Sequence, residues 1–200
     1  MMLIVIDGPD FAGKSTIIQN LAKSLSERGY DVRTSRTSVC GIFSNIVELA
    51  QSERTHSLIK SLIFHAAYLI DVFTGPRSWI HIQETYWPRV FAYDIVHRRP
   101  LGYAFFTAFR RAFIKPDLSI FIEANFTTRY RRYRSSDLFD KRDSLRFGEG
   151  RSEYKRLIAA YRLLCSREGY QIMFNNAGDP DHFSSQLLNI IENIYAKDFI

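Results

Sequence analysis

The chain has 200 residues, of which 46% are hydrophobic and 24% charged, and it carries a formal net charge of +6. This length and apolar content fit one α/β domain over residues 1–200, and no linker, low-complexity tract or solenoid repeat divides it. Polar residues interrupt every long apolar run, which excludes a membrane span, and the apolar start is too short for a signal peptide. Cys40 and Cys165 lack metal-ligand spacing and fit a reducing compartment, so we expect a cytoplasmic enzyme.

Short apolar runs recur along the chain and predict strands that are buried on both faces of a sheet. These runs are Leu3–Ile6, Val32–Thr34, Trp79–Ile82, Leu118–Glu123 and Gln171–Phe174. Helical patterns lie between and after them. They cover Ser15–Arg28, Ile42–Gln51, Thr55–Phe73, Phe91–Val96 with Tyr103–Phe113, Thr127–Arg134, Ser152–Arg167 and Pro180–Ala196. The alternation predicts a five-stranded parallel sheet flanked by helices, with ligands at the carboxyl ends of the strands.

A glycine-rich segment follows the first predicted strand and opens the first predicted helix. Its residues are Gly8, Pro9, Asp10, Phe11, Ala12, Gly13, Lys14, Ser15 and Thr16. Gly8 and Gly13 permit backbone conformations that turn several N–H groups toward one anion, and the helix N-terminus adds its positive end. Lys14 can reach the outer phosphates, and the Ser15 hydroxyl is placed to ligate Mg²⁺. The segment therefore predicts a P-loop that binds ATP, within the three-layer P-loop NTPase fold.

Polar and cationic groups also follow the other predicted strands. They are Ser35–Thr37, Gln83–Tyr86, Glu123 with the arginine-rich helix after it, and Asn175–Gly178. Because the carboxyl ends of parallel strands meet at one edge of a sheet, we expect these groups to converge on the P-loop. Phosphoryl transfer needs this arrangement, since it depends on positioning and on positive charge around the moving group.

The positive charge is concentrated in one segment. Residues 129–156 hold ten Arg and Lys against five Asp and Glu. Such a cluster favours an anionic partner, either the phosphates of a small ligand or a nucleic acid backbone. Tyr130, Tyr133 and Tyr154 are interleaved with the basic residues, as in proteins that bind single strands, but the acidic residues weaken an extended positive groove.

The arginines of the predicted helix at residues 127–134 form two pairs. Arg129 and Arg132 share one helix face, and Arg131 and Arg134 share another, so only one pair can point toward bound phosphates. Arg132 and Arg134 lie nearest the start of a candidate lid, at about residues 134–150. We therefore take these two as the candidate catalytic arginines.

In order and spacing, the motifs resemble those of the thymidylate kinase family of nucleoside monophosphate kinases over nearly the full chain. The segments that carry the resemblance are Ile6–Thr16, Arg36, Leu62–Ala67, Glu84–Tyr86, Ala92–Tyr93, Arg129–Arg142 with Tyr154 and Tyr161, and Asn175–Gly178. The resemblance implies transfer of the γ-phosphate of ATP to dTMP, with Mg²⁺ as cofactor. It also implies a homodimer formed through helices near Phe64.

The resemblance assigns roles on the acceptor side of the site. The family carries an acidic residue where Asp10 stands, and its carboxylate faces the sugar of the acceptor. Arg36 matches an arginine that holds the acceptor phosphate, and Phe64 matches an aromatic residue that stacks on the base. Tyr93 matches a residue that continues into the next helix beside the acceptor.

On the donor side, the resemblance places Asn176 and Ala177 beside the adenine of ATP. The residues themselves suggest that Lys14 neutralises the β- and γ-phosphates and that Ser15 ligates Mg²⁺ directly. Glu84 is a candidate to hold the ion through water, and the alternative is a buried salt bridge. A nucleoside monophosphate needs no strong general base, whereas a nucleoside hydroxyl would need one, and Asp10 or Glu84 would then be the candidates.

The chain departs from the family pattern on the acceptor side. Thr85 and Tyr68 stand where the family has arginines, the first on the transferring phosphate and the second on the base. Arg89, in the turn after Thr85, is a candidate to restore the missing charge. Phe11 stands where one branch of the family has Lys or Arg, which favours the branch with arginines on the lid.

Three hypotheses remain open from the sequence. The first is a kinase that acts on dTMP. The second keeps the chemistry but changes the acceptor to a deoxynucleoside or another small metabolite, because Thr85 and Tyr68 replace expected arginines. The third is a nucleotide-dependent protein that binds nucleic acid through residues 129–156.

Overall fold

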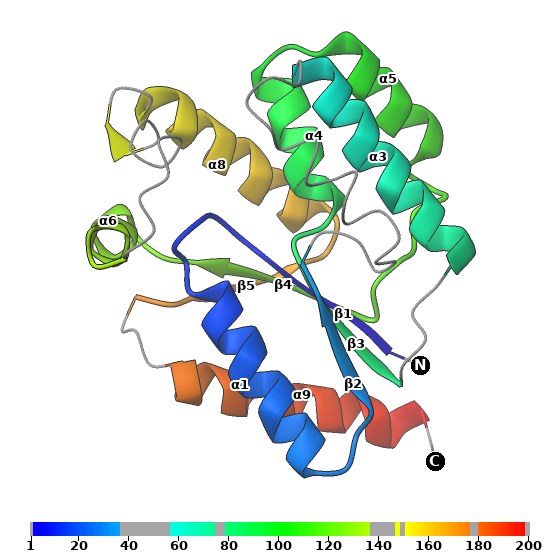
Figure 1. Cartoon of the computed structure of the whole chain (residues 1–200), viewed down its shortest axis with the longest axis vertical. Helices are drawn as coiled ribbons and strands as arrows, with labels where there is room; N and C mark the ends of the chain where they lie inside the picture. The colour runs from blue at the N-terminus through cyan, green and yellow to red at the C-terminus, as the bar shows by residue number, and fades with distance from the viewer. Residues whose placement is uncertain are drawn as a thin grey trace.

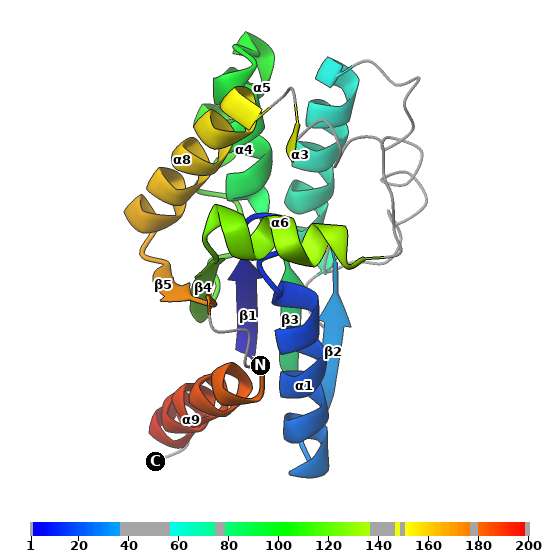
Figure 2. The same ribbon diagram turned by 90° about the vertical axis from the view of Figure 1, so that its left-hand side faces the viewer.

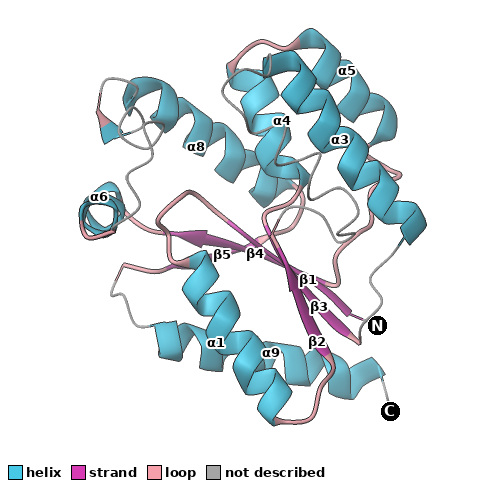
Figure 3. Cartoon of the chain, viewed as in Figure 1, coloured by secondary structure: helices cyan, strands magenta, loops and turns pink. Residues whose placement is uncertain are grey.

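The computed structural model describes residues 2–36, 57–74, 79–136, 147–148, 151–176 and 180–198. Within them a parallel sheet has the strand order β2-β3-β1-β4-β5. The strands are β1 (Met2–Asp7), β2 (Val32–Ser35), β3 (Ile80–Glu84), β4 (Leu118–Glu123) and β5 (Gln171–Phe174). Every residue of β1 is buried, as expected for a central strand covered on both faces. The predicted three-layer α/β fold is confirmed (Figure 1, Figure 3).

One face of the sheet is covered by α1 (Lys14–Glu27) and α9 (Pro180–Asp198), which lie together below it in Figure 1. In α1 the buried residues Ile17, Leu21 and Leu25 recur every four positions and form one apolar stripe. They pack against β1, β3 and β4 and against Leu187 and Ile191 of α9. This aliphatic core fixes the start of α1 directly behind the P-loop.

The other face of the sheet is covered by α3 (Ser57–Thr74), α4 (Trp87–Val96), α5 (Pro100–Phe109) and α8 (Arg151–Arg167). The core here is largely aromatic. Its buried members include Tyr68, Tyr86, Trp87, Phe91, Phe106, Phe121, Tyr154 and Tyr161. The remaining helix, α6 (Phe126–Arg134), covers neither face of the sheet. It lies across the carboxyl ends of the strands in Figure 2, beside the start of α1. That edge of the sheet is where the predicted polar groups were expected to meet.

The structure confirms all five predicted strands and corrects the bounds of several elements, β3, α4 and α5 among them. β3 extends to Glu84 rather than ending at Ile82. α4 begins at Trp87 rather than Phe91, and α5 runs from Pro100 to Phe109 rather than from Tyr103 to Phe113. Each of these two helices has a proline in its first turn, where the missing N–H costs nothing.

The predicted helix at residues 42–51 and most of the candidate lid lie outside the described residues. In the part of the chain that is described, no helix is both long enough and apolar enough to cross a membrane.

Candidate functional site

The P-loop joins β1 to α1, and its backbone requires glycine at two positions. Gly8 has φ 140°, and a Cβ there would overlap the carbonyl oxygen of Ile122 in β4. Gly13 has φ 95°, and a Cβ there would lie 2.6 Å from Nδ2 of Asn175. Gly13 is also the N-cap residue of α1, so the loop ends where the positive end of the helix begins. The structure thus places an anion-binding loop at the edge of the sheet.

Lys14, Ser15 and Glu84 come together at the start of α1. The Ser15 hydroxyl donates to both carboxylate oxygens of Glu84, each at 3.1 Å. Nζ of Lys14 lies 3.9 Å from Oε1 of Glu84 and donates to the carbonyl oxygen of Pro9 at 3.0 Å. Burial lowers the pKa of the Lys14 ammonium, and the neighbouring carboxylates, Asp10 first, oppose that shift. A hydroxyl and a carboxylate are the oxygen donors that Mg²⁺ prefers, so these residues fit the predicted metal.

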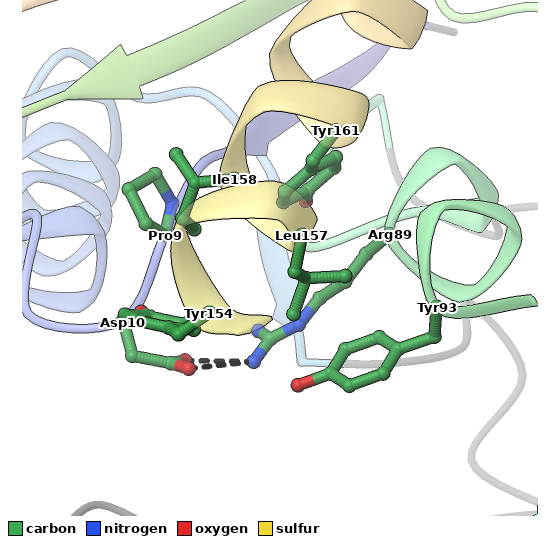
Figure 4. A pocket seen from close by; sticks show the side chains of 8 residues that line it. All are labelled: Pro9, Asp10, Arg89, Tyr93, Tyr154, Leu157, Ile158 and Tyr161. Atoms are coloured by element: carbon green, nitrogen blue, oxygen red, sulfur yellow. Dashed lines mark hydrogen bonds and ion pairs between the residues drawn. The ribbon is translucent and has the colours of Figure 1, made fainter. Parts of the chain in front are cut away.

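The second part of the site is a small pocket beside the P-loop. Figure 4 shows its lining: Pro9 and Asp10 from the loop, Arg89 and Tyr93 from α4, and Tyr154, Leu157, Ile158 and Tyr161 from α8. Nη2 of Arg89 donates to both oxygens of Asp10, at 2.8 and 2.9 Å. The hydroxyl end of Tyr93 points into the same space as the Arg89 guanidinium (Figure 4). Burial works to lower the pKa of Arg89, but the Asp10 carboxylate, together with Tyr93 and Tyr154, outweighs it and raises that pKa.

The other predicted acceptor residues, Arg36, Phe64, Tyr68 and Thr85, are not among the residues that line this pocket. Tyr68 has no exposed surface and packs edge-to-face against Tyr86, with ring centroids 5.1 Å apart, so its ring belongs to the aromatic core. Phe64, one turn earlier in α3, is partly buried against the same core. Arg36 is exposed at the carboxyl end of β2. Among these predicted residues, Asp10, Arg89 and Tyr93 line the pocket.

Thr85 has a backbone conformation that β-branched residues rarely adopt, with φ 71°. Its N–H donates to the carbonyl oxygen of Ile6 at 3.1 Å, and its own carbonyl accepts from Nε2 of Gln83 at 3.2 Å. The next N–H, that of Tyr86, donates to Oδ2 of Asp7 at 3.2 Å. Because three bonds hold this turn, the strained conformation persists between the P-loop and α4.

The sequence interpretation missed Asp7 and the contact it makes. Asp7 has no exposed surface and accepts a hydrogen bond from the Tyr161 hydroxyl of α8. The same hydroxyl accepts from the N–H of Gly8 at 3.4 Å, so it links the P-loop to α8. Burial raises the pKa of Asp7 to about 7, against the opposing effect of the Lys14 and Arg89 charges. An acidic residue at the end of an otherwise apolar strand was the available signal.

The arginines of α6 divide as the two-pair pattern required. Nε of Arg129 donates to the carbonyl oxygen of Ala124 at 3.0 Å, and its Nη1 donates to the Tyr154 hydroxyl at 3.2 Å. Arg132 binds the carbonyl oxygen of Phe11 in the P-loop at 3.1 Å through Nη1. Arg131 and Arg134 are exposed. The inward pair is therefore Arg129 and Arg132, and of the two predicted catalytic arginines, Arg132 points inward whereas Arg134 is exposed.

The segment after β5 contacts both α6 and the P-loop. Arg132 also donates through Nη2 to the carbonyl oxygen of Asn175, at 3.2 Å. The Asn175 side chain donates to the carbonyl oxygen of Ala12 at 2.8 Å, so it holds the backbone of the P-loop in place. The side-chain oxygen of Asn176 accepts from the N–H of Asn125 at 2.8 Å. Ala177, also predicted beside the adenine, lies outside the described residues.

Comparison with known proteins gives one family and one fold. Residues 6–168 match the family model described as thymidylate kinase. Among solved structures, thymidylate kinase from Ehrlichia chaffeensis aligns with a TM-score of 0.68 and 15% identity, covering 96% of this chain and 98% of that chain. Thymidylate kinase from Candida albicans aligns with a TM-score of 0.71 and 16% identity, covering 96% of this chain and 91% of that chain.

None of the curated protein sequences compared with this chain matches it. At 15% and 16% identity the solved structures show that the fold is shared. The family model covers most of the sequence, including the P-loop, the pocket beside it and all of α8. The chain therefore belongs to the thymidylate kinase family.

Proposed function

We propose that this protein transfers the γ-phosphate of ATP to a nucleoside monophosphate, with dTMP as the first candidate acceptor. The observation that carries the proposal is the shared position of Asp10. Asp10 belongs to the P-loop, yet it also forms one wall of the neighbouring pocket. A donor on the loop and an acceptor in the pocket would therefore meet at one point, as phosphoryl transfer requires. The family and the fold support a nucleoside monophosphate kinase.

On the donor side, the backbone from Gly8 to Ser15 would hold the β- and γ-phosphates. Lys14 would neutralise the charge on them, and Asn175 keeps the loop in place from below. Mg²⁺ would be held by Ser15 directly and by Glu84 through water, and it supplies charge neutralisation when bound. No cluster of three or more His, Cys, Asp or Glu ligands occurs among the described residues. Phosphate oxygens and water would thus complete the shell, as is usual for Mg²⁺.

On the acceptor side, Arg89 is the cation that we propose for the acceptor phosphate. It lies in the pocket, in the turn after Thr85, and its Nη1 and Nε are not used in the bonds to Asp10. We assign Asp10 to the acceptor sugar, Phe64 to the base, and Tyr93 and Arg36 to the rim of the site. Tyr68 is too deeply buried to reach a base without a rearrangement of the core.

Arg132 is our first candidate for a catalytic arginine. Its guanidinium already lies on the P-loop backbone at Phe11, where it adds positive charge beside the bound phosphates. Arg134 remains a weaker candidate because it is exposed in this arrangement. Asp10 acts as a base only if the acceptor is a hydroxyl, since a phosphate oxygen is already ionised.

The buried state of Tyr68 favours a second candidate function. A site without an arginine that reads the base would discriminate weakly among acceptors, so a deoxynucleoside or another small metabolite is the alternative. A nucleic-acid partner has less support. Arg129 and Arg132 are engaged in internal hydrogen bonds, which leaves only Arg131 and Arg134 exposed on α6.

We also propose a homodimer through α3 and α5. Ile59 of α3 and Leu101 and Phe109 of α5 are large apolar side chains that are 51%, 55% and 42% exposed. The two helices lie side by side on the outer edge of the molecule (Figure 1). Exposed apolar patches of this kind usually mark a surface that another protein chain covers, and most soluble oligomers are formed by identical chains. Light scattering on the wild-type chain and on Leu101→Asp tests this. We expect the mass of a dimer for wild type and of a monomer for the variant, and the same mass for both proteins would reject the proposal.

A coupled assay of ADP release decides between the two acceptors. Purified protein with ATP and Mg²⁺ is supplied with dTMP, with the other common nucleoside monophosphates, or with thymidine. We expect the largest stimulation with a monophosphate, and dTMP above thymidine. Preference for thymidine would support the second candidate, and no stimulation by any acceptor while ATP binds would reject the kinase proposal.

A further inference from the structure

A buried polar cluster joins α3 to α4 outside the site described above. Its members are Ser61 and His65 of α3 and Asp94 of α4. These three side chains are 1%, 0% and 1% exposed. The Ser61 hydroxyl lies 2.7 and 2.8 Å from the two oxygens of Asp94, and Nε2 of His65 lies 2.8 Å from Oδ2. One carboxylate thus binds two side chains that are one turn apart on the neighbouring helix.

The surroundings are built to accommodate this carboxylate. Nη1 of Arg99, just before α5, lies 3.4 Å from Oδ1 of Asp94 and provides a compensating charge. Gly102 of α5 leaves room for the carboxylate, because a Cβ there would overlap Oδ2. The His65 ring stacks on Phe105 of α5, with centroids 5.4 Å apart. The α3–α4–α5 layer visible in Figure 1 therefore has a polar centre within an aromatic shell.

The cluster is not explained by stability alone. A buried ion pair often contributes little net stability relative to apolar residues of the same size, because desolvation offsets the attraction. Moreover, Nδ1 of His65 is buried and has no hydrogen-bond partner among the described residues. The Nε2–H tautomer leaves Nδ1 as a bare acceptor, whereas an Nδ1–H would be a buried unpaired donor. What such a cluster does supply is a unique register between two helices.

The helices whose register is fixed are those that carry the acceptor residues. Phe64 adjoins His65 in α3, and Tyr93 adjoins Asp94 in α4. Arg89 is five residues before Asp94 on the same helix. A slip of α3 by one residue would rotate it by about 100° and remove both donors from Asp94. The rotation that satisfies Asp94 therefore also sets the direction of Phe64 relative to α4.

We propose that Asp94, with Ser61 and His65, is a positioning residue that sets the acceptor wall formed by Phe64 and Tyr93. It acts through α3 and α4 and does not touch the substrate. This inference rests on the proposed function, since it assigns the wall to a bound nucleoside. It predicts a defect confined to the acceptor, because α1, which follows the P-loop, packs on the opposite face of the sheet from α3 and α4.

The test compares Asp94→Ala, Ser61→Ala and Asp94→Asn with Ile95→Ala. Ile95 is an exposed neighbour on α4 and serves as the matched control. We expect Asp94→Ala to raise the KM for the acceptor about tenfold, with the KM for ATP unchanged, since small displacements of a positioned substrate are costly. Ser61→Ala should show a smaller effect in the same direction. Asp94→Asn keeps the shape but replaces one acceptor oxygen with an NH2 donor, so its acceptor KM should lie between those of wild type and Asp94→Ala.

A merely structural role gives a different result. The variants would then lose thermal stability, while the acceptor KM of the remaining folded enzyme would match wild type, and that outcome overturns the proposal. If Asp94→Ala does not fold, Ser61→Ala and Asp94→Asn still decide the question. Hydrogen exchange serves as a second readout. Faster exchange in residues 61–69 and 89–96 of Ser61→Ala, with α1 unchanged, supports the inference, and uniform exchange rejects it.

The exchange measurement needs no turnover. If wild-type enzyme shows no acceptor-dependent reaction, the proposed function fails, and exchange alone then decides whether the cluster sets the register of α3 and α4.

Discussion

At the residue scale, the ion pair between Asp10 and Arg89 gives the pocket beside the P-loop a charged wall. The two residues are 79 positions apart, and the P-loop and α4 bring them within 2.8 Å. Arg89 places a partly buried cation in the first turn of α4, close to Thr85, where the sequence pattern lacks an expected arginine. The positive charge that Thr85 lacks is thus present four positions later, on Arg89.

Replacing Arg89 by Met should raise the KM for the acceptor at least tenfold and leave the KM for ATP within about twofold. The variant loses the guanidinium that we assign to the acceptor phosphate, whereas the P-loop backbone that we assign to ATP is unchanged. Arg89→Lys is the matched control and should recover only part of the affinity, because an ammonium lacks the planar set of donors. Steady-state kinetics with each substrate varied in turn measures this. An acceptor KM unaffected by Arg89→Met would contradict the assignment.

Asp7 gives a second prediction at this scale, which concerns pH. Its folded-state pKa is raised from 3.8 to about 7 by burial, so the folded protein holds a proton that the unfolded chain releases. The stabilising effect of that proton is fully present below pH 3.8 and is lost as the pH rises through 7. Between pH 5 and 8 the free energy of unfolding of wild type should fall by about 2 kcal/mol relative to Asp7→Asn.

Urea unfolding of wild type and Asp7→Asn at both pH values measures this difference. The asparagine can still accept from the Tyr86 N–H and bond the Tyr161 hydroxyl, so the comparison isolates the charge. Parallel pH profiles for the two proteins would show that Asp7 does not titrate in this range.

At the element scale, α6 explains why spacing alone could not select a catalytic arginine. Its sequence offered two pairs, and only the packing of α6 against the P-loop and α8 shows that Arg129 and Arg132 face inward. Arg129 is largely structural, because its bonds are to Ala124 and Tyr154. Arg132 binds the P-loop itself, which makes it the arginine of α6 closest to the proposed chemistry.

We therefore expect Arg132→Gln to lower kcat about a hundredfold, the usual effect of removing one donor that stabilises the transition state. Arg134→Gln has the same change in charge on the exposed side and should lower kcat less than about twofold. Single-turnover rates with saturating substrates compare the two. Equal losses in both variants, or a larger loss in Arg134→Gln, would return the role to Arg134.

At the scale of the whole molecule, the fold was largely predictable because its signals are local. The apolar runs located every strand, and the glycine pattern located the P-loop. Helix starts at Trp87 and Pro100 were missed because the prolines in their first turns were not used as start signals. Contacts such as that between Asp7 and Tyr161, 154 positions apart, depend on tertiary packing and leave no local pattern.

We propose that a phosphoryl group passes from ATP on the P-loop to a monophosphate in the pocket lined by Arg89. Incubation with ATP labelled on its γ-phosphate, Mg²⁺ and dTMP, followed by separation of the nucleotides, tests it directly. We predict that label appears in dTDP and that Lys14→Met abolishes the transfer. Label found only in inorganic phosphate, or retained in ATP with every monophosphate supplied, would contradict the claim.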